Sequence, residues 1–598
     1  MSDSLLKNLD AFRLLRNARC LWTLLLCGWL GFSVSSADDT IIAKAQASHF
    51  LSQASMGGTV AEIDALAANI VSMGHIEACE AWMDDQFTKP RGKTLDIVCR
   101  NLHAEDNVAY TANSSGAWWD YGWWSQAVST DEQLRYRVGF ALSQIAVVSD
   151  NYWEGLFRSR YLAHVKYYQR LMDVAFTSHR EFLTNITYSP MMGVWLSHAQ
   201  NAKGDEEAGI FPDENFAREI LQLFSMGVYE QDASGEFVLD FNNTPIENYT
   251  NDDIKEFAKV FTGLSINDKR SFFGKNLTLI GNYPLQMVSG QHHTGEKKLL
   301  NGTTLPANQG GNTDIAAALN NIAYHPSTAP NFSRLLIKRL TSSNPSNDYI
   351  KRVTDAWYGL GDYGSDVEGD FQAVLKAILL DPEARNALNY TVVDGVLTAE
   401  PVDALRAKVK EPILKMTQFL RFANPETYGD TVYLRLNPIA RGTGQPILGA
   451  DTVFNFYDAD FSPAGGPIED YVNSLPEDPY ATELEIVAPE LQILPQNIVA
   501  EHEKFYQMVE SNDALSIQAN KAYYTSSFVH LDTLKAGAFE DSAALLQHLN
   551  VYLCNGQLPA DVASVWANTF DINVDDPVES YAQLFTQVFV SSAYSVLY

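Results

Sequence analysis

Residues 212–227, PDENFAREILQLFSMG, carry the pattern that decides the fold class. Apolar residues recur there at helical spacing and form a wide apolar face: Phe216, Ala217, Ile220, Leu221, Leu223 and Phe224. Asp213 or Asn215 is suited to cap the start of a helix, and Gly227 is suited to end it. The stretch is therefore predicted to form one amphipathic helix with a polar end.

The same helical spacing recurs along most of the chain, and Thr59 is suited to cap its first instance. It predicts helices in these segments: 59–72, 130–149, 251–265, 314–326, 329–345, 369–384, 405–423, 541–554 and 580–593. Residues 268–312 lack the spacing and are rich in Gly, Asn and Thr, which predicts a loop or small hairpin. The predicted fold is mainly α, a large multi-helix globular protein with long ordered loops and a minor β-hairpin-like insertion.

The predicted organisation divides the chain into six regions. They are a signal peptide (1–37), an N-terminal helical region (38–267), a loop or hairpin insertion (268–312), a second helical region (313–425), an irregular ordered region (426–500) and C-terminal helices (501–598).

The first 37 residues have the layout of a secretory signal peptide. Basic residues precede the apolar run LWTLLLCGWLGFSV, and small residues end at Ala37. The run is shorter than the roughly 20 residues of a membrane span, although an uncleaved N-terminal anchor is the alternative. We expect export to the periplasm, the outer envelope or the extracellular space, with no transmembrane span after the signal peptide.

The composition is that of an acidic globular protein. The chain has 598 residues, of which 46% are hydrophobic, and its formal net charge is −31. That apolar content is enough for a large core. Nucleic acid is excluded as a partner, because binding to phosphates needs a basic surface.

Three cysteines follow the signal peptide: Cys79, Cys99 and Cys554. In an oxidising compartment Cys79 and Cys99 are able to pair, which would leave Cys554 free. The chain has no CxxC spacing for zinc, no HExxH motif, no GxSxG elbow and no dinucleotide fingerprint. The sequence therefore names no metal and no cofactor, and it leaves enzymatic activity open.

Two segments supply five candidate site residues. In the helix of residues 212–227, Asn215 and Glu219 project side by side, while Arg218 is placed to pair with Glu214. One interpretation is a helix cap with an ion pair, and the other is a carboxylate, Glu219, that acts as a base or metal ligand with Arg218 holding an anion.

The second segment, GQHHTGEK, spans residues 290–297 and contributes His292 and Lys297. His292 is a candidate for acid–base chemistry or metal binding, and Lys297 for holding an anion. The alternative is a loop histidine that is only solvated or hydrogen-bonded.

An aromatic cluster lies in GAWWDYGWWSQAV, residues 116–128. In an exported protein its rings would suit stacking against sugars. The alternative is that the rings anchor one layer of helices on another.

Several segments together carry a resemblance to a known family. They include residues 134–149, 249–266, 292–307, 319–353, 369–385, 452–463 and 487–493, and above all 191–228, in which Asn-Phe-Ala-Arg-Glu is followed by Leu-Phe-x-x-Gly. The chain resembles the bacterial domain of unknown function 1800 family, large exported proteins without an established activity. Other branches carry a Trp-His-x-His pattern near residues 137–149. This chain has no histidine there, which argues against a metal site that depends on those histidines.

The resemblance also implies a partner, since such proteins are often encoded beside an exported, sulfatase-like family. Two hypotheses follow. The first is an envelope or surface protein that acts with an exported partner. The alternative is an exported enzyme, with a metal-assisted hydrolase among the options, whose site lies between the Asn215–Glu219 helix and the His292–Lys297 loop.

Overall fold

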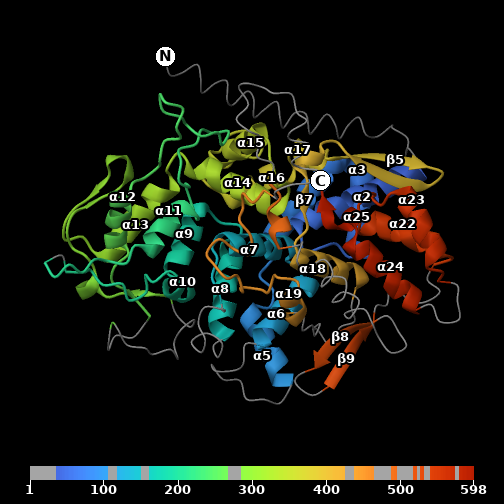
Figure 1. The fold of residues 1–598 in the computed structure, drawn as a ribbon, viewed down its shortest axis with the longest axis horizontal. Helices are drawn as coiled ribbons and strands as arrows, with labels where there is room; N and C mark the ends of the chain where they lie inside the picture. The colour runs from blue at the N-terminus through green and yellow to red at the C-terminus, as the bar shows by residue number, and fades with distance from the viewer. Residues whose placement is uncertain are drawn as a thin grey trace, which may run out of the picture.

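Helices dominate the computed structural model of the protein (Figure 1). The structure describes residues 36–105, 117–149, 161–205, 207–266, 272, 284–424, 437–462, 487–493, 516–521, 525–530, 539–572 and 578–598. Within these residues every sheet has two strands. The predicted mainly α fold class is therefore confirmed.

The N-terminal part of the described chain is a succession of helices: α2 (Ala37–Ala54), α3 (Val60–Met73), α4 (His75–Thr88), α5 (Leu95–Glu105), α6 (Ala117–Ser129), α7 (Gln133–Ile145) and α8 (Tyr161–Val174). Two of these helices begin at capping boxes, in which a hydroxyl and a carboxylate satisfy free backbone N–H groups. Ser36 and Asp39 cap α2, and Thr59 and Glu62 cap α3. The predicted N-cap at Thr59 is confirmed.

A second group of helices gathers at one end of the molecule (Figure 1): α9 (His179–Thr187), α10 (Pro190–Trp195), α11 (Asn215–Gln222), α12 (Asn251–Val260) and α13 (Gly311–Ala323). Short elements run between them: β1 (Leu264–Ser265) paired with β2 (Gln286–Met287), β3 (Lys297–Lys298) paired with β4 (Thr304–Leu305), η2 (Ser289–Gln291) and η3 (Leu300–Gly302). The β3–β4 pair is the small hairpin expected in the 268–312 insertion. Residues 267–271 and 273–283 lie outside the described part.

Residues 228–247 form an extended ribbon between α11 and α12. Its antiparallel bridges join Tyr229 to Glu247, Gln231 to Phe237 and Leu239 to Pro245. Apolar side chains remain uncovered along the ribbon, and Phe241 is 94% exposed.

The middle of the molecule contains α14 (Thr328–Leu340), α15 (Asn347–Trp357), α16 (Phe371–Leu379) and α17 (Pro382–Arg385), followed by the hairpin of β5 (Leu388–Val393) and β6 (Val396–Pro401). This hairpin lies in the region expected to be helical. Its two-residue turn has positive φ at Asp394 (52°) and Gly395 (78°), which is the backbone of a tight hairpin turn favoured by Asp-Gly.

The remaining elements are η4 (Ala404–Arg406), β7 (Lys408–Val409), α18 (Pro412–Ala423), α19 (Asn437–Gly442), η5 (Pro489–Gln492), β8 (Ser516–Lys521), β9 (Thr525–His530), α22 (Ser542–Tyr552), α23 (Ala560–Thr569), α24 (Val578–Val590), α25 (Ser592–Ser595) and β10 (Val596–Leu597). The β8–β9 pair adds a hairpin to the region predicted as C-terminal helices. β10 pairs with β7, and α22 packs on α2, where the Ser48 hydroxyl donates to the Tyr552 carbonyl at 2.8 Å.

The apolar core is continuous from α2 to α25. Every residue of α18 is buried within it. Trp119, Trp123 and Trp124 are core residues, and the rings of Trp123 and Trp124 meet edge to face at 5.1 Å. These three rings therefore anchor helices, as the second interpretation of the aromatic cluster predicted. The side chains of Trp118 and Tyr121 lie outside the described part.

Three features of the chain bear on its expected export: the cysteines, the N-terminal residues and the presence or absence of a membrane-spanning helix. Cys79, Cys99 and Cys554 are buried, and Cys79 and Cys99 do not form the considered disulfide with each other. Residues 1–35, nearly all of the predicted signal peptide, are not described. Among the residues that are, none of the helices has both the length and the apolar character needed to cross a membrane.

Candidate functional site

The predicted polar end of α11 forms mainly a cap and an ion pair. Glu214 occupies the N-cap position without capping through its side chain, and the Asp213 carboxylate accepts the Asn215 N–H at 2.9 Å. The Arg218 guanidinium lies 3.6 Å from Glu214 in a pair that is partly exposed. Asn215 itself is exposed. The geometry of these residues is therefore that of a helix start on the surface.

Glu219, on the same helix, has a different environment. It is buried, and its Oε2 atom has no hydrogen-bond partner. Burial raises the pKa of the Glu219 carboxyl above its ordinary value, against the opposing effect of Arg218. Burial and the charge of Glu219 also raise the pKa of Tyr249, whose hydroxyl likewise lacks a partner. Glu219 thus stays a candidate proton donor.

His292 and Lys297 are sealed inside the protein around Asp314, a residue that the sequence did not single out. Asp314 Oδ2 lies 3.0 Å from His292 Nε2 and 2.6 Å from Lys297 Nζ. His292 Nδ1 faces the Thr262 carbonyl at 3.0 Å, and Gln309 donates to Asp314 Oδ1 at 2.7 Å. The Lys297 and Asp314 side chains are both 0% exposed. We call His292, Lys297 and Asp314 the sealed cluster.

Within the described residues, no hydrogen bond or ion pair joins Asn215, Arg218 or Glu219 to His292 or Lys297. A pocket of about 650 Å³ over α12 is lined by the neighbours Glu214 and Lys298, but by none of the five candidates. Within the described ranges, no group of three His, Cys, Asp or Glu residues is placed to hold a metal ion. The catalytic assignment of Asn215, Arg218, Glu219, His292 and Lys297 therefore stays a prediction.

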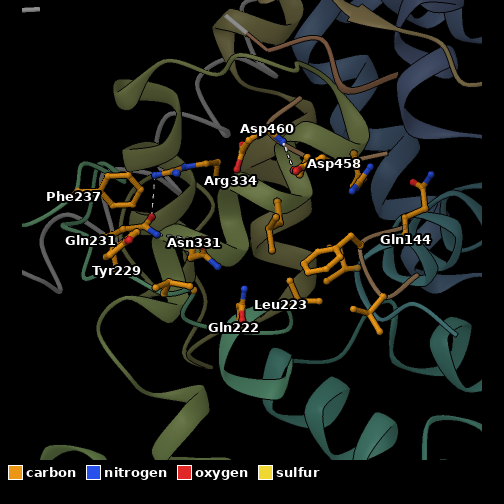
Figure 2. A pocket seen from close by; sticks show the side chains of 18 residues that line it. Gln144, Gln222, Leu223, Tyr229, Gln231, Phe237, Asn331, Arg334, Asp458 and Asp460 are labelled. Carbon is orange, nitrogen blue, oxygen red and sulfur yellow. Dashed lines mark hydrogen bonds between the residues drawn. The ribbon is translucent and has the colours of Figure 1, made fainter. Parts of the chain in front are cut away.

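A different pocket lies at the other end of the α11 segment (Figure 2). Its volume is about 360 Å³. Four stretches far apart in the sequence line it. Its main lining residues are Gln144 and Ile145 from α7, Gln222, Leu223, Tyr229, Gln231 and Phe237 from the α11 segment and the ribbon, Asn331, Arg334 and Arg339 from α14, and Val453, Phe454, Asp458 and Asp460 from the loop after α19. We call it the α14 pocket.

Hydrogen bonds hold the polar side chains of this pocket in fixed orientations. Arg334 donates to Gln231 Oε1 at 2.9 Å (Figure 2). It also contacts the Gly235 carbonyl. Asn331 donates to the Ser225 carbonyl at 2.8 Å and accepts from Gln231 Nε2 at 3.1 Å. The amide and guanidinium groups are therefore preorganised, which lowers the entropy cost of binding a ligand.

Two carboxylates complete the wall. Asp458 and Asp460 are exposed, and Lys338 Nζ lies 2.5 Å from Asp460 Oδ1. Burial works to raise the pKa of Asp460, but the Lys338 ammonium more than reverses this and brings the pKa below its ordinary value. Asp460 is therefore an anion at neutral pH.

The floor of the α14 pocket rests on a buried ionic network around Glu411. Gln144 Nε2 donates to Glu411 Oε2 at 2.5 Å, and Gln445 donates to the same oxygen at 2.8 Å. Lys408 Nζ lies 3.6 Å from Glu411 Oε1 and also pairs with Glu490. Burying charged groups costs free energy of folding unless each group is paired. Because movement of Gln144 would remove a hydrogen bond from the buried Glu411 carboxylate, the network holds this side chain in one orientation.

Two atoms of the floor residues keep unused hydrogen-bonding capacity. Gln144 Oε1 has no donor and Arg339 Nε has no acceptor, although both residues are buried. Buried polar groups are normally satisfied, so such atoms often mark a place where a ligand or water binds.

Sequence reasoning missed this pocket because its walls come from residues more than a hundred positions apart, such as Gln222, Arg334 and Asp458. One signal was present. Residues 134–149, 191–228, 319–353 and 452–463, four of the segments that carry the family resemblance, each contribute to the lining.

Comparison with known proteins gives one match. A family model described as "Protein of unknown function (DUF1800)" matches residues 49–596, so the chain belongs to this family. Neither the curated proteins nor the solved structures include a match to the chain.

Proposed function

We propose that this member of the DUF1800 family is an exported, non-catalytic binding protein of the cell envelope or surface, and that it holds a small polar ligand in the α14 pocket. One observation carries the proposal. Fixed polar groups from four distant stretches converge on a cavity of about 360 Å³. Small-molecule sites commonly have this size and combine apolar walls with a few oriented polar groups.

The sealed cluster favours binding over catalysis. In the enzyme hypothesis His292 and Lys297 must reach a substrate. Both are instead paired with Asp314 in a region without solvent contact. A reacting group needs access to substrate and room for the transition state.

Export and a partner belong to the same proposal. The signal-peptide-like start of the sequence supports export, and the family resemblance supports an exported sulfatase-like partner. The apolar side chains of the ribbon, above all Phe241, supply a surface on which that partner would dock.

Glu219 supports a second candidate function, an exported enzyme. Its carboxyl is buried with one oxygen unpartnered, and its pKa is raised. These are properties of a general acid. In this alternative Glu219 donates a proton to a substrate that enters beside α11.

Native mass spectrometry of the full-length protein, purified from cells that produce it, tests the binding function. We expect wild type to release a small molecule on denaturation and Gln222→Trp, which fills the α14 pocket, to release none. Val565→Trp, at an exposed position of α23, is the matched control and should retain the molecule. A molecule kept by Gln222→Trp, or absent from wild type, contradicts the proposal.

Two further variants separate the hypotheses. In the binding hypothesis, Glu219→Gln should retain the bound molecule, and neither this variant nor wild type should convert it. In the enzyme alternative, wild type should convert a substrate and Glu219→Gln should abolish that turnover. Co-purification of the sulfatase-like protein should be lost with Phe241→Asp and kept with Val565→Asp. Loss with both variants, or with neither, removes the ribbon as the docking surface.

A further inference from the structure

The α14 pocket has a chemical character that narrows its ligand. Its lining combines amide groups, which donate and accept, with guanidinium donors and carboxylate acceptors. A ligand that satisfies such a mixture must itself both donate and accept at neighbouring positions. Hydroxyl groups do this, whereas phosphates and sulfates mainly accept and ammonium groups only donate.

Charge balance argues against an anionic ligand. Arg334 and Arg339 face Asp458 and Asp460, so the charged side chains that line the pocket cancel formally. Arg334 already donates to Gln231 and Gly235, and Lys338 is paired with Asp460. Sites for anions keep an excess of positive charge directed at the ligand. This pocket has no such excess among the residues described.

Aromatic rings stand at one side of the pocket. Tyr229 and Phe237 are 38% and 46% exposed and contact each other edge to face at 5.5 Å. Figure 2 shows Phe237 and Tyr229 on the side of the view opposite Gln144, with Arg334 and Asn331 between them. Ring faces offer apolar contact to the C–H groups of a ligand whose hydroxyls point elsewhere.

The inner end of the pocket offers a polar anchor. Gln144 Oε1 lacks a donor, while Gln144 Nε2 is held by Glu411. The amide therefore cannot rotate to satisfy its oxygen without losing the charged partner of its nitrogen. A hydroxyl group from a ligand would supply the missing donor once the neighbouring side chains move to expose Oε1, which has less than 1 Å² of accessible surface.

From these observations we propose that the α14 pocket binds a neutral polyhydroxylated ligand, a small carbohydrate, with its C–H face against Tyr229 and Phe237 and a hydroxyl toward Gln144. This inference rests on the proposed binding function and names its ligand class. A free sugar and the end of a longer glycan share this chemistry.

The test uses isothermal titration of the full chain with a panel of neutral disaccharides, namely cellobiose, maltose and chitobiose, together with digalacturonic acid, inorganic sulfate and inorganic phosphate. An array of immobilised neutral glycans extends the panel and separates chain ends from free sugars. We expect saturable binding of a neutral saccharide and none of the inorganic anions.

Pocket variants then locate the binding. Phe237→Ala should weaken it roughly 2- to 10-fold through loss of the ring contact, and Gln222→Trp should abolish it. Val565→Ala, on exposed α23, should bind like wild type. Thermal unfolding of each variant checks folding, and Phe237→Leu, which keeps an apolar side chain of similar size without the ring, substitutes for Phe237→Ala should the latter unfold.

The outcomes are distinguishable from those of the parent proposal. Binding only of digalacturonic acid, sulfate or phosphate, lost in Gln222→Trp, overturns the neutral carbohydrate and leaves the binding function standing. No neutral glycan bound in solution or on the array also overturns the inference. Binding of a neutral saccharide that Gln222→Trp leaves intact places the ligand elsewhere and overturns both.

Discussion

The sealed cluster and the α14 pocket bring charged side chains together in opposite ways. Around Asp314 the groups are fully buried and each finds a partner within the protein. In the α14 pocket, Arg334 and Asp460 also have partners, but a cavity of about 360 Å³ separates the walls. The comparison shows that charged side chains close together in space indicate a functional site only when a cavity beside them is large enough for a ligand.

The largest expected effect tests whether the sealed cluster is structural. Asp314→Ala leaves the Lys297 ammonium buried without its counter-charge and His292 Nε2 without its hydrogen-bond partner, so we expect the free energy of unfolding to fall by about 3–5 kcal/mol. Urea denaturation measures the change. Glu214→Ala, which breaks an exposed pair, is the control and should cost about 0–1 kcal/mol. Equal losses of unfolding free energy in the two variants would mean that the buried pairs of Asp314 are no more important for stability than the partly exposed pair of Glu214.

The second test concerns the network beneath the α14 pocket. Glu411→Gln keeps the side-chain shape but removes the charge that holds Gln144 and pairs with Lys408. We expect a loss of about 1.5–3 kcal/mol in urea denaturation, together with weaker ligand binding. Unchanged binding at reduced stability would show that the floor does not position Gln144 for a ligand.

The third test uses pH at Glu219. Because burial raises the pKa of Glu219 in the folded state, its favourable contribution is present below its unfolded pKa, near 4.5, and is lost as pH rises through the folded pKa. Glu219→Gln mimics the neutral form and should remove this decline. Thermal unfolding of both proteins from pH 4 to pH 8 measures the difference. Parallel curves would mean that Glu219 is not destabilised by its burial.

The smallest change in stability is expected at Asp460, the exposed carboxylate that lines the α14 pocket. The Asp460 side chain is 75% exposed, so Asp460→Asn should cost less than about 1 kcal/mol despite the loss of its pair with Lys338. Its folded pKa is lowered, so the stabilisation is present at neutral pH and is lost as pH falls through the folded pKa. Acid titration of both proteins, followed by circular dichroism, checks this. A cost equal to that of Asp314→Ala would show that the wall is closed rather than open.

Local signals in the sequence were sufficient for much of the fold. Thr59 with Glu62 caps α3, and the apolar spacing that begins at residue 251 corresponds to α12, although this helix ends at Val260 and residues 264–265 form β1. The β5–β6 hairpin was also marked locally, by Asp394-Gly395 between alternating residues, but the surrounding helical pattern obscured it.

The candidate site could not be predicted in the same way, because it depends on which distant residues meet. His292 and Lys297 have side chains of types found in active sites, but both are bound to Asp314 inside the protein. The sequence around these residues contains no pattern that predicts this pairing. Likewise, the segment containing Asn215 and Glu219 was identified from its polar end. The pocket lies at its other end, beside Gln222, because α14 and the loop after α19 pack there.

The packing of α2 against α22 has a consequence for the order of folding. The Ser48 hydroxyl donates a hydrogen bond to the Tyr552 carbonyl, 504 residues further along the chain. Strand β7 likewise pairs with β10, which lies near the end of the sequence. A chain that is still being synthesised has α3 and α4 to pack on α2, but it lacks α22, which covers another part of α2. Pairings over such separations form slowly, since a long loop must close first. The contact between α2 and α22 is therefore expected to form late in folding, and a chain that ends before α22 is expected to remain a substrate for chaperones and proteases.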